Sequence, residues 1–336
     1  MKRTILSFAV MIIVILLVSF LLIAMVGSDI PTSLASFFRG IGGSTCAMAE
    51  VLVRATPLML AALGVSVGFR TGFLNIGAEG QLYLGAISIT WLGMTFPTLP
   101  APLMLVLSLV LGFLSGGLWA LIPGLLKAKF GLSEVINTIM LNYIAINLVG
   151  ILVRTSLKDP TYPYPMSPML PASTNFLQLL SPTRLHAGLL LALVCAALVY
   201  LLMFQTTLGF CMRAVGLNAR ACQCSGIAVS KYVIISSLIS GGLSGLAGVS
   251  EIAGLHHRLI EGISPSYGYL AIIVSLLGRN NPVGIVFASL GIAALQVGSM
   301  SMQRSSGVPT SIASIIMGLV VIMILSRKSL FRCKEA

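Results

Sequence analysis

Gly72-Phe-Leu-Asn-Ile-Gly-Ala-Glu-Gly-Gln-Leu-Tyr-Leu-Gly85 carries polar side chains inside a run apolar enough to cross a bilayer. These side chains belong to Asn75, Glu79 and Gln81, and several glycines lie close to them. In hydrocarbon, loosened backbone is tolerated only where protein or a water-filled cavity surrounds it, and a carboxylate needs the same shelter. The stretch therefore predicts a broken transmembrane helix that lines a polar pathway.

The composition indicates that lipid is the solvent of this chain. Its 336 residues are 57% hydrophobic and 8% charged, whereas soluble proteins average about 25% charged residues. A net charge of +12 would suggest nucleic acid in a soluble protein, but Lys and Arg collect in the cytosolic loops of membrane proteins. We therefore expect an all-α polytopic membrane protein without a nucleic-acid partner. The six cysteines form no C-x-x-C pair, so neither a metal site nor a disulfide framework is expected.

Apolar segments close to the length that a helix needs to cross a bilayer recur along the chain. About ten qualify or nearly qualify, the third being the broken one and the eighth short. They run over 5–26, 47–68, 73–96, 101–126, 135–153, 187–205, 232–253, 266–278, 283–301 and 309–326. Most basic residues then fall in cytosolic turns, which predicts that both termini lie in the cytosol. The first segment is too long for a signal peptide, so we expect it to remain as an anchor.

A single transmembrane domain is expected to fill residues 1–336. Its two helix groups each contain one short or interrupted segment, and the two run in opposite directions, which predicts an inverted repeat with the substrate route where the halves meet. Within the second group, Asn218 can cap a short cytosolic helix and Gly226 can end it. The expected parts are an N-terminal anchor and outer segment (1–46), a first helix group (47–153), a proline-rich outer loop (154–186), a second helix group (187–326) with a cytosolic segment (206–231), and a basic cytosolic tail (327–336).

Polar residues on other spans are further candidates for the pathway. Glu50 precedes Arg54 by one helical turn, so the two can pair as a pathway lining or as an interfacial ion pair. Asn137 and Asn142 can hydrogen-bond between helices or face the pathway. Glu79 either accepts hydrogen bonds from the freed backbone of its own helix or shapes the substrate route. An ion-coupled secondary transporter that uses Glu50, Arg54 and Glu79 as its relay is one alternative.

The sequence motifs that could indicate an enzyme give little support for catalytic activity in this chain. The sequence lacks G-x-x-x-x-G-K-[ST], so the chain is not expected to be an ATPase by itself. Gly64-Val-Ser-Val-Gly68 matches G-x-S-x-G, which would make Ser66 a protease nucleophile only on a strand-to-helix turn near a histidine. Small residues four apart, as in Gly112-x-x-x-Gly116 and Gly241-x-x-x-Gly245, are more typical of close helix packing. An intramembrane serine protease is thus the weaker alternative.

Several motifs together resemble one family. Gly68-Phe-Arg-Thr-Gly-Phe-Leu-Asn-Ile-Gly-Ala-Glu-Gly-Gln81 resembles the signature of membrane permeases of ABC importers in the branched-chain amino acid, simple sugar and nucleoside group. Ser133-Glu-Val-Ile-Asn-Thr-Ile-Met-Leu-Asn-Tyr-Ile-Ala145 is similar to a second signature, that of the nucleoside branch. The stretch from Arg213-Ala-Val-Gly-Leu-Asn-Ala-Arg-Ala221 through Ser225-Gly-Ile227 resembles the cytosolic coupling segment, and Gly278-Arg-Asn-Asn-Pro282 and Gly307-Val-Pro309 complete the set.

This resemblance covers residues 47 to 326 and implies the other parts of a transporter. They are a second permease subunit, identical or paralogous, ABC ATPase subunits that carry ATP-Mg, and an extracytoplasmic substrate-binding protein or lipoprotein. It implies a bacterial cytoplasmic membrane, no cofactor in this chain, and import of a nucleoside-like solute by alternating access, with riboflavin or a simple sugar as alternatives. The residues implied to couple to the ATPases are Arg213, Gly216, Asn218, Arg220 and Gly226. The segment departs from the family pattern at Ala219, where proline is usual, and at Cys222, where alanine is common.

Overall fold

The computed structural model describes residues 20–21, 29–309, 311–312, 314–315, 318–319 and 322. Over these ranges the chain is helical, and its only β-structure consists of isolated bridges. The expected all-α fold is therefore confirmed. The expected first and last spans, 5–26 and 309–326, fall largely outside the described residues, and the basic tail falls wholly outside them.

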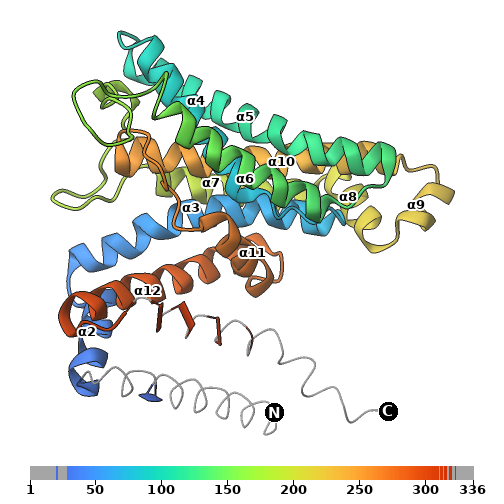
Figure 1. Cartoon of the computed structure of the whole chain (residues 1–336). Helices are drawn as coiled ribbons and strands as arrows, with labels where there is room; N and C mark the ends of the chain where they lie inside the picture. The colour runs from blue at the N-terminus through green and yellow to red at the C-terminus, as the bar shows by residue number, and fades with distance from the viewer. Residues whose placement is uncertain are drawn as a thin grey trace, which may run out of the picture. The chain divides into compact units, whose positions relative to one another are not determined.

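The other eight expected spans correspond to helices, with ends that differ by a few residues (Figure 1). They are α3 (Thr45–Arg70), α4 (Ala78–Thr95), α5 (Ala101–Phe130), α6 (Glu134–Leu152), α7 (Gly188–Gln205), α10 (Val229–Glu251), α11 (Tyr267–Leu277) and α12 (Pro282–Ser306). Within the described part of the chain, six helices are long and apolar enough to cross a membrane, and α4 and α11 are not among them. The chain is thus a multi-pass membrane protein in which the less apolar α4 and the short α11 accompany six helices that could span the membrane.

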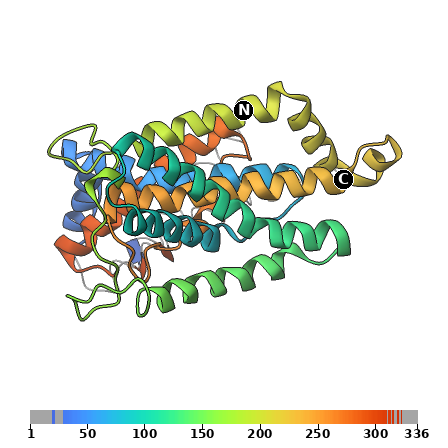
Figure 2. The same cartoon turned by 90° about the horizontal axis from the view of Figure 1, so that it is seen from above.

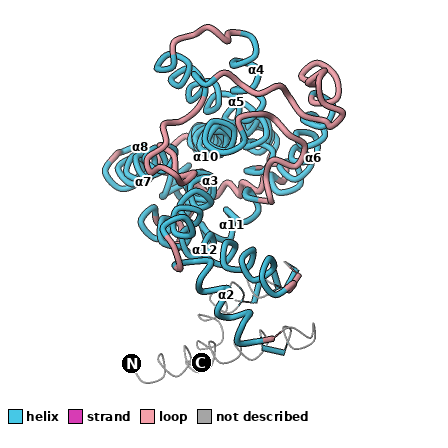
Figure 3. The backbone as a smooth tube through the Cα atoms, turned by 90° about the vertical axis from the view of Figure 1, so that its left-hand side faces the viewer, coloured by secondary structure: helices cyan, strands magenta, loops and turns pink. Residues whose placement is uncertain are grey.

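The contacts divide the chain into two compact units, residues 53–289 and residues 1–52 together with 290–336. In the larger unit, α10 lies at the centre, with α3, α5 and α6 around it in the end-on view of Figure 3. Small residues allow the closest contact: a Cβ on Gly116 would lie 2.8 Å from the Cα of Gly245, and one on Gly245 would lie 3.1 Å from the Cα of Gly116. The expected packing through glycines four apart is confirmed.

The smaller unit contains a helix that the sequence analysis did not predict, α2 (Ile30–Gly42). Asp29 caps its first turn by accepting a hydrogen bond of 3.2 Å from the backbone N–H of Thr32. The helix packs within its own unit, because a Cβ on Gly298 would lie 2.7 Å from the ring of Phe37. Ile30 packs against a small buried apolar cluster farther along the chain, formed by Met302, Val308 and Ile312.

The two long loops of the larger unit lie at opposite ends of its helices (Figures 1 and 2). One end holds the proline-rich loop, which includes the short 3-10 helix η1 (Ala172–Thr174), and the π-helix η2 (Ile252–His256) that continues α10. The other end holds α8 (Thr207–Leu217) and α9 (Ala219–Cys224). This arrangement agrees with the expectation that the two loops lie on opposite sides of the membrane.

Candidate functional site

The interruption predicted from the sequence lies between α3 and α4, in a non-helical stretch that we call the interrupted segment (residues 71–77). Gly72 has φ +79°, and the N–H of Phe73 donates to the carbonyl of Gly68 over 2.9 Å, so α3 ends in a glycine-based C-terminal cap. The break lies in the first part of the predicted stretch, because Gly80 and Gly85 lie inside continuous α4. These glycines serve close packing instead: a Cβ on Gly85 would lie 2.8 Å from the Cα of Gly245.

Asn75 and Gln81 form a reciprocal amide pair that holds the interrupted segment against the start of α4. The amide of each donates to the amide oxygen of the other over 2.9 Å. Asn75 also donates to the hydroxyl of Ser240 on α10 over 2.8 Å and accepts from the N–H of Gly77 over 2.9 Å. Since both side chains are at most 1% exposed, an unmade bond here would leave a buried polar group unsatisfied.

Glu79 joins α4 to α11. Its carboxylate accepts a hydrogen bond of 2.6 Å from the N–H of Gly268, in the first turn of α11. The backbones meet directly, because a Cβ on Gly268 would lie 2.7 Å from the carbonyl carbon of Ala78. The carboxylate thus sits near the N-termini of α4 and α11, where the helix dipoles favour negative charge. Such a meeting of short segments is what an inverted repeat would produce, although the repeat itself stays a prediction.

Asn142 on α6 completes the set of buried side chains that pair with freed backbone groups. Its side-chain oxygen accepts from the N–H of Gly80 over 2.8 Å, and its amide donates to the carbonyl of Ile76 over 2.9 Å and to the hydroxyl of Tyr269 over 3.3 Å. Of the two roles considered for Asn142, bonding between helices is therefore the one that the structure describes. Asn137, one and a half turns earlier on α6, is half-buried.

An ion pair fixes the other side of the interrupted segment. Lys127, in the last turn of α5, contacts Glu134 at the start of α6 over 2.5 Å. Lys127 also donates to the carbonyl of Gly72 over 2.5 Å, and Glu134 accepts from the N–H of Leu74 over 3.2 Å. Side chains from α4, α5, α6 and α10 thus satisfy backbone or amide groups between residues 72 and 81, which is the condition for non-helical backbone at membrane depth.

The structure therefore brings four of the six expected pathway residues into one network: Asn75, Glu79, Gln81 and Asn142. All are at most 3% exposed, so in this conformation they lie in the interior of the protein. The sixth, Glu50, belongs to the smaller unit. Sequence reasoning missed the partners of the network, Ser240, Gly268 and Tyr269.

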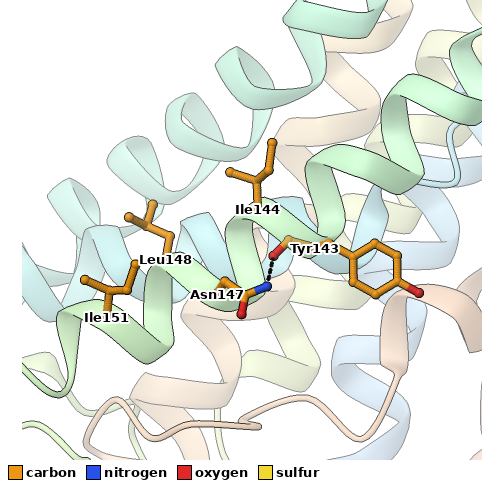
Figure 4. A pocket seen from close by; sticks show the side chains of 5 residues that line it. All are labelled: Tyr143, Ile144, Asn147, Leu148 and Ile151. Atoms are coloured by element: carbon orange, nitrogen blue, oxygen red, sulfur yellow. Dashed lines mark hydrogen bonds between the residues drawn. The ribbon is translucent and has the colours of Figure 1, made fainter.

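A shallow depression lies on the surface of α6 (Figure 4). It has a volume of about 350 Å³ and is lined by Tyr143, Ile144, Asn147, Leu148 and Ile151. Asn147 is exposed there, and its amide donates to the carbonyl of Tyr143 over 2.8 Å. The amide is thus satisfied within α6 itself, and the depression is otherwise lined by apolar groups.

The serine protease motif does not have the geometry that its chemistry needs. Ser66 lies within α3 rather than on a strand-to-helix turn, and its hydroxyl donates to the carbonyl of Leu63 over 2.7 Å. The residue is 1% exposed. A nucleophile elbow requires a strained turn that exposes the hydroxyl, so this motif belongs to helix packing.

The expected coupling residues lie on α8, on α9 and at the turn that ends α9. The side chain of Asn218 caps α9 by accepting from the N–H of Ala221 over 3.0 Å, and Gly226 ends the helix with φ +78°. Arg220 is exposed, whereas Arg213 is half-buried and lies over the ring of Phe204. The predicted capped helix is confirmed, with Leu217 protruding beside it at 88% exposure.

The helical architecture, the buried polar network and the capped helix at one end define a polytopic membrane permease. The chain belongs to the family described as "branched-chain amino acid transport system / permease component", whose model matches residues 47–325. It is 36% identical over 304 residues to the guanosine ABC transporter permease protein NupP of Bacillus subtilis, covering 89% of this chain and 87% of that protein.

Other relatives point to the same class. The chain is 34% identical to the nucleoside ABC transporter permease protein NupB of Lactococcus lactis, over 84% of this chain and 80% of that one. It is 36% identical to the glucose ABC transporter permease protein TsgB13 of Haloferax volcanii, over 83% and 76%. A solved structure, PsaBC from Streptococcus pneumoniae in complex with Fab, covers 90% of this chain and is itself covered to 99%, but at 12% identity and a TM-score of 0.48 it adds nothing to this assignment.

Proposed function

We propose that this chain is the membrane-spanning permease subunit of an ATP-driven importer in a bacterial cytoplasmic membrane, and that it moves a nucleoside-like solute into the cell. The observation that carries the proposal is the 36% identity to a guanosine permease over 89% of the chain. The capped helix α9 supports it, because a self-sufficient transporter needs no such docking element. Both termini lie in the cytosol, and the chain itself has no ATPase activity and no cofactor.

The partners follow from the same proposal. ABC ATPase subunits, which carry ATP-Mg, bind the coupling segment, which we define as residues 206–231. A second permease subunit, identical or paralogous, completes the membrane part. This second subunit faces α6, where Tyr143 and Asn147 are exposed. The proposed route of the solute runs along the same face. Asn75, Glu79, Gln81 and Asn142 then act as the frame that positions α4, α6 and α11 beside the route.

A substrate-binding protein or lipoprotein docks on the proline-rich loop. Tyr164 and Met169 are 68% and 62% exposed there. Deleting Tyr162–Pro171 would test this dock, but it would also remove the hydrogen bond of 2.9 Å from the N–H of Ser167 to the carbonyl of Leu259. The sharper test is therefore the double variant Tyr164→Ala/Met169→Ala, which should weaken capture of the loaded binding protein at unchanged stability. Unchanged uptake at limiting solute would reject this dock.

The transport function is tested by reconstituting the chain with the second permease subunit, the ATPase subunits and the binding protein of its transporter. Uptake of labelled guanosine that needs ATP, and stops when the ATPase is omitted, is the expected result. Uptake by this chain alone, driven by an ion gradient, would instead establish the secondary transporter. Labelling of the chain by a serine-directed probe, lost in Ser66→Ala, would revive the protease reading.

A simple sugar is the second candidate substrate, because the glucose permease relative is as similar in sequence as the guanosine permease, at 36% identity. Riboflavin is a third candidate, supported by 25% identity to the probable riboflavin import permease protein RfuC of Treponema pallidum. Competition of guanosine, glucose and riboflavin for uptake of each labelled solute separates the three. Inhibition by glucose but not by guanosine would overturn the nucleoside assignment.

A further inference from the structure

We propose that Arg70 is a positioning residue that transmits movement of the coupling segment to the interrupted segment and to α11. The inference rests on the proposed function, in which ATPase subunits bind α8 and α9. Beyond that function, the inference names the residue through which movement of α8 and α9 reaches the interior of the permease. Arg70 is the last residue of α3 and directly precedes the interrupted segment.

The first step is a contact of backbone on backbone between the end of α8 and the end of α3. A Cβ on Gly216 would lie 2.8 Å from the carbonyl carbon of Arg70 and 3.1 Å from that of Thr71. A Cβ on Gly72 would lie 3.5 Å from the Cα of Gly216. Since no flexible side chain separates these segments, a displacement of α8 moves residues 70–72 directly.

The second step is a shared aromatic ring. The guanidinium carbon of Arg70 lies 4.8 Å from the ring centroid of Phe204, and that of Arg213 lies 5.2 Å from the same centroid. The ring attracts both cations, whereas the two positive charges repel each other. Among the described residues, the buried Nε atom of Arg213 has no hydrogen-bond partner. The ring is thus a contact that Arg213 shares with Arg70, and a small shift of α8 changes the distance between the two guanidiniums.

The third step leads from Arg70 to the far end of α11. The Nε atom of Arg70 donates to the backbone carbonyl of Asn280 over 2.5 Å. Arg279 and Asn280 have φ values of 55° and 54°, a left-handed conformation that residues with a side chain adopt rarely and at a cost. The hydrogen bond from Arg70 thus holds a strained turn directly after α11.

Together these contacts hold α11 at both ends from one short stretch of chain. Glu79 binds its first turn through Gly268, and Arg70 binds the turn that follows it. Arg70 and Glu79 flank the interrupted segment, which is itself hydrogen-bonded to α5, α6 and α10. Movement of α8 would therefore carry the interrupted segment and α11 together, which is how docking of the ATPases reaches the polar network.

The test compares solute transported with ATP hydrolysed in the reconstituted transporter. Arg70→Ala should still assemble with the ATPase subunits and hydrolyse ATP, but the solute imported per ATP should fall roughly two- to thirtyfold, the range seen for residues along coupling networks. Arg70→Lys keeps the charge but lacks the Nε–H donor, so it should restore only part of the ratio. Lys129→Ala, which removes an exposed positive charge from the last turn of α5, outside the coupling segment, is the matched control and should leave the ratio unchanged.

The outcomes separate this inference from the function on which it rests. If the wild-type chain binds no ATPase, the proposed function fails. If Arg70→Ala assembles normally and imports as much solute per ATP as the wild type, the function stands and the inference is overturned. Should Arg70→Ala not assemble, Phe204→Leu decides, because it removes the ring under both guanidiniums and leaves the Arg70–Asn280 bond in place: a lowered ratio supports the inference, and an unchanged ratio rejects it.

Discussion

The interrupted segment at one end of the larger unit and the proline-rich loop at the other satisfy their backbones in different ways. The interrupted segment uses side chains of distant helices, such as Lys127 for the carbonyl of Gly72. The loop pairs many of its backbone groups with other backbone groups, as where the N–H of Leu170 donates to the carbonyl of His257 over 2.9 Å. The stability of the interrupted segment therefore depends on which side chains surround it, whereas that of the loop depends more on the path of its backbone. Substitutions should lower stability strongly near the interrupted segment and only slightly in the loop.

The largest effect is expected for Asn75→Leu. It removes four hydrogen bonds and leaves the amide of Gln81 buried without partners. Each buried group left unsatisfied costs about 1–3 kcal/mol, so the free energy of unfolding in mixed detergent should fall by roughly 4 kcal/mol in total. The double variant Asn75→Leu/Gln81→Leu should recover part of this loss, because both members of the pair become apolar.

A matched change at the other end sharpens the comparison. Gln178→Leu replaces an exposed amide in the proline-rich loop and should change the free energy of unfolding by less than about 0.5 kcal/mol. Equal losses for Gln178→Leu and Asn75→Leu would break the contrast between the two ends.

His186 is an exception at the loop end, because its substitution should have a marked effect on stability. It is 3% exposed and stacks on Phe176 with 5.8 Å between ring centroids, and burial, with a smaller contribution from His257, lowers its pKa from 6.5 to about 4. Below pH 6.5 the unfolded chain binds a proton that the folded chain refuses. Stability should thus be complete above pH 6.5 and fall by up to about 3 kcal/mol as the pH drops to 4.

Unfolding measured between pH 7.5 and 4 tests this expectation. His186→Phe keeps a ring against Phe176 but cannot titrate, so its stability should vary less over that range. An identical pH profile in the variant would mean that other groups cause the loss of stability at low pH, and that His186 is no exception at the loop end.

Much of the fold follows from local pattern, but the partners of the polar network do not. Apolar runs predict α3 and α5 to within a few residues, and Asn218 predicts the start of α9, because these signals are local. The partners Ser240 and Gly268 lie 165 and 189 positions from Asn75 and Glu79. Hydropathy and spacing contain no information about which helices meet, so these contacts are out of reach of a single sequence.

Two local features were also misread or missed. The glycines of the stretch 72–85 favour a broken helix when only the sequence is considered, but Gly80 and Gly85 serve close packing instead, and only the neighbouring helix decides which. The helix α2 was missed although Asp29 before Ile30-Pro31 is an N-terminal signal, namely a capping side chain followed by proline in the first turn.

A smaller loss is expected for Glu134→Gln at the interrupted segment. The side chains of Lys127 and Glu134 are 25% and 11% exposed, which places the pair between a surface salt bridge and a buried one. The neutral amide can still accept from the N–H of Leu74, so the free energy of unfolding should fall by only about 1–2 kcal/mol. Adding Lys127→Met should deepen the loss, because it also removes the hydrogen bond that Lys127 donates to the carbonyl of Gly72. No loss at all would mean that the hydrogen bonds, rather than the charges, hold this end.

The ion pair at the loop end should have the smallest effect. The Nη2 atom of Arg154 lies 2.7 Å from the Oε2 atom of Glu261, but the two side chains are 57% and 44% exposed. Exposed pairs of this kind contribute about 0.2–1 kcal/mol and are screened by salt. A double-mutant cycle of Arg154→Ala and Glu261→Ala should therefore give a coupling energy below about 1 kcal/mol that fades at high salt, whereas the cycle for Lys127 and Glu134 should give a larger and less salt-sensitive value. If the exposed pair couples as strongly as the sheltered one, burial is not what makes the two ends different, and the dependence on residue identity has to come from hydrogen bonding alone.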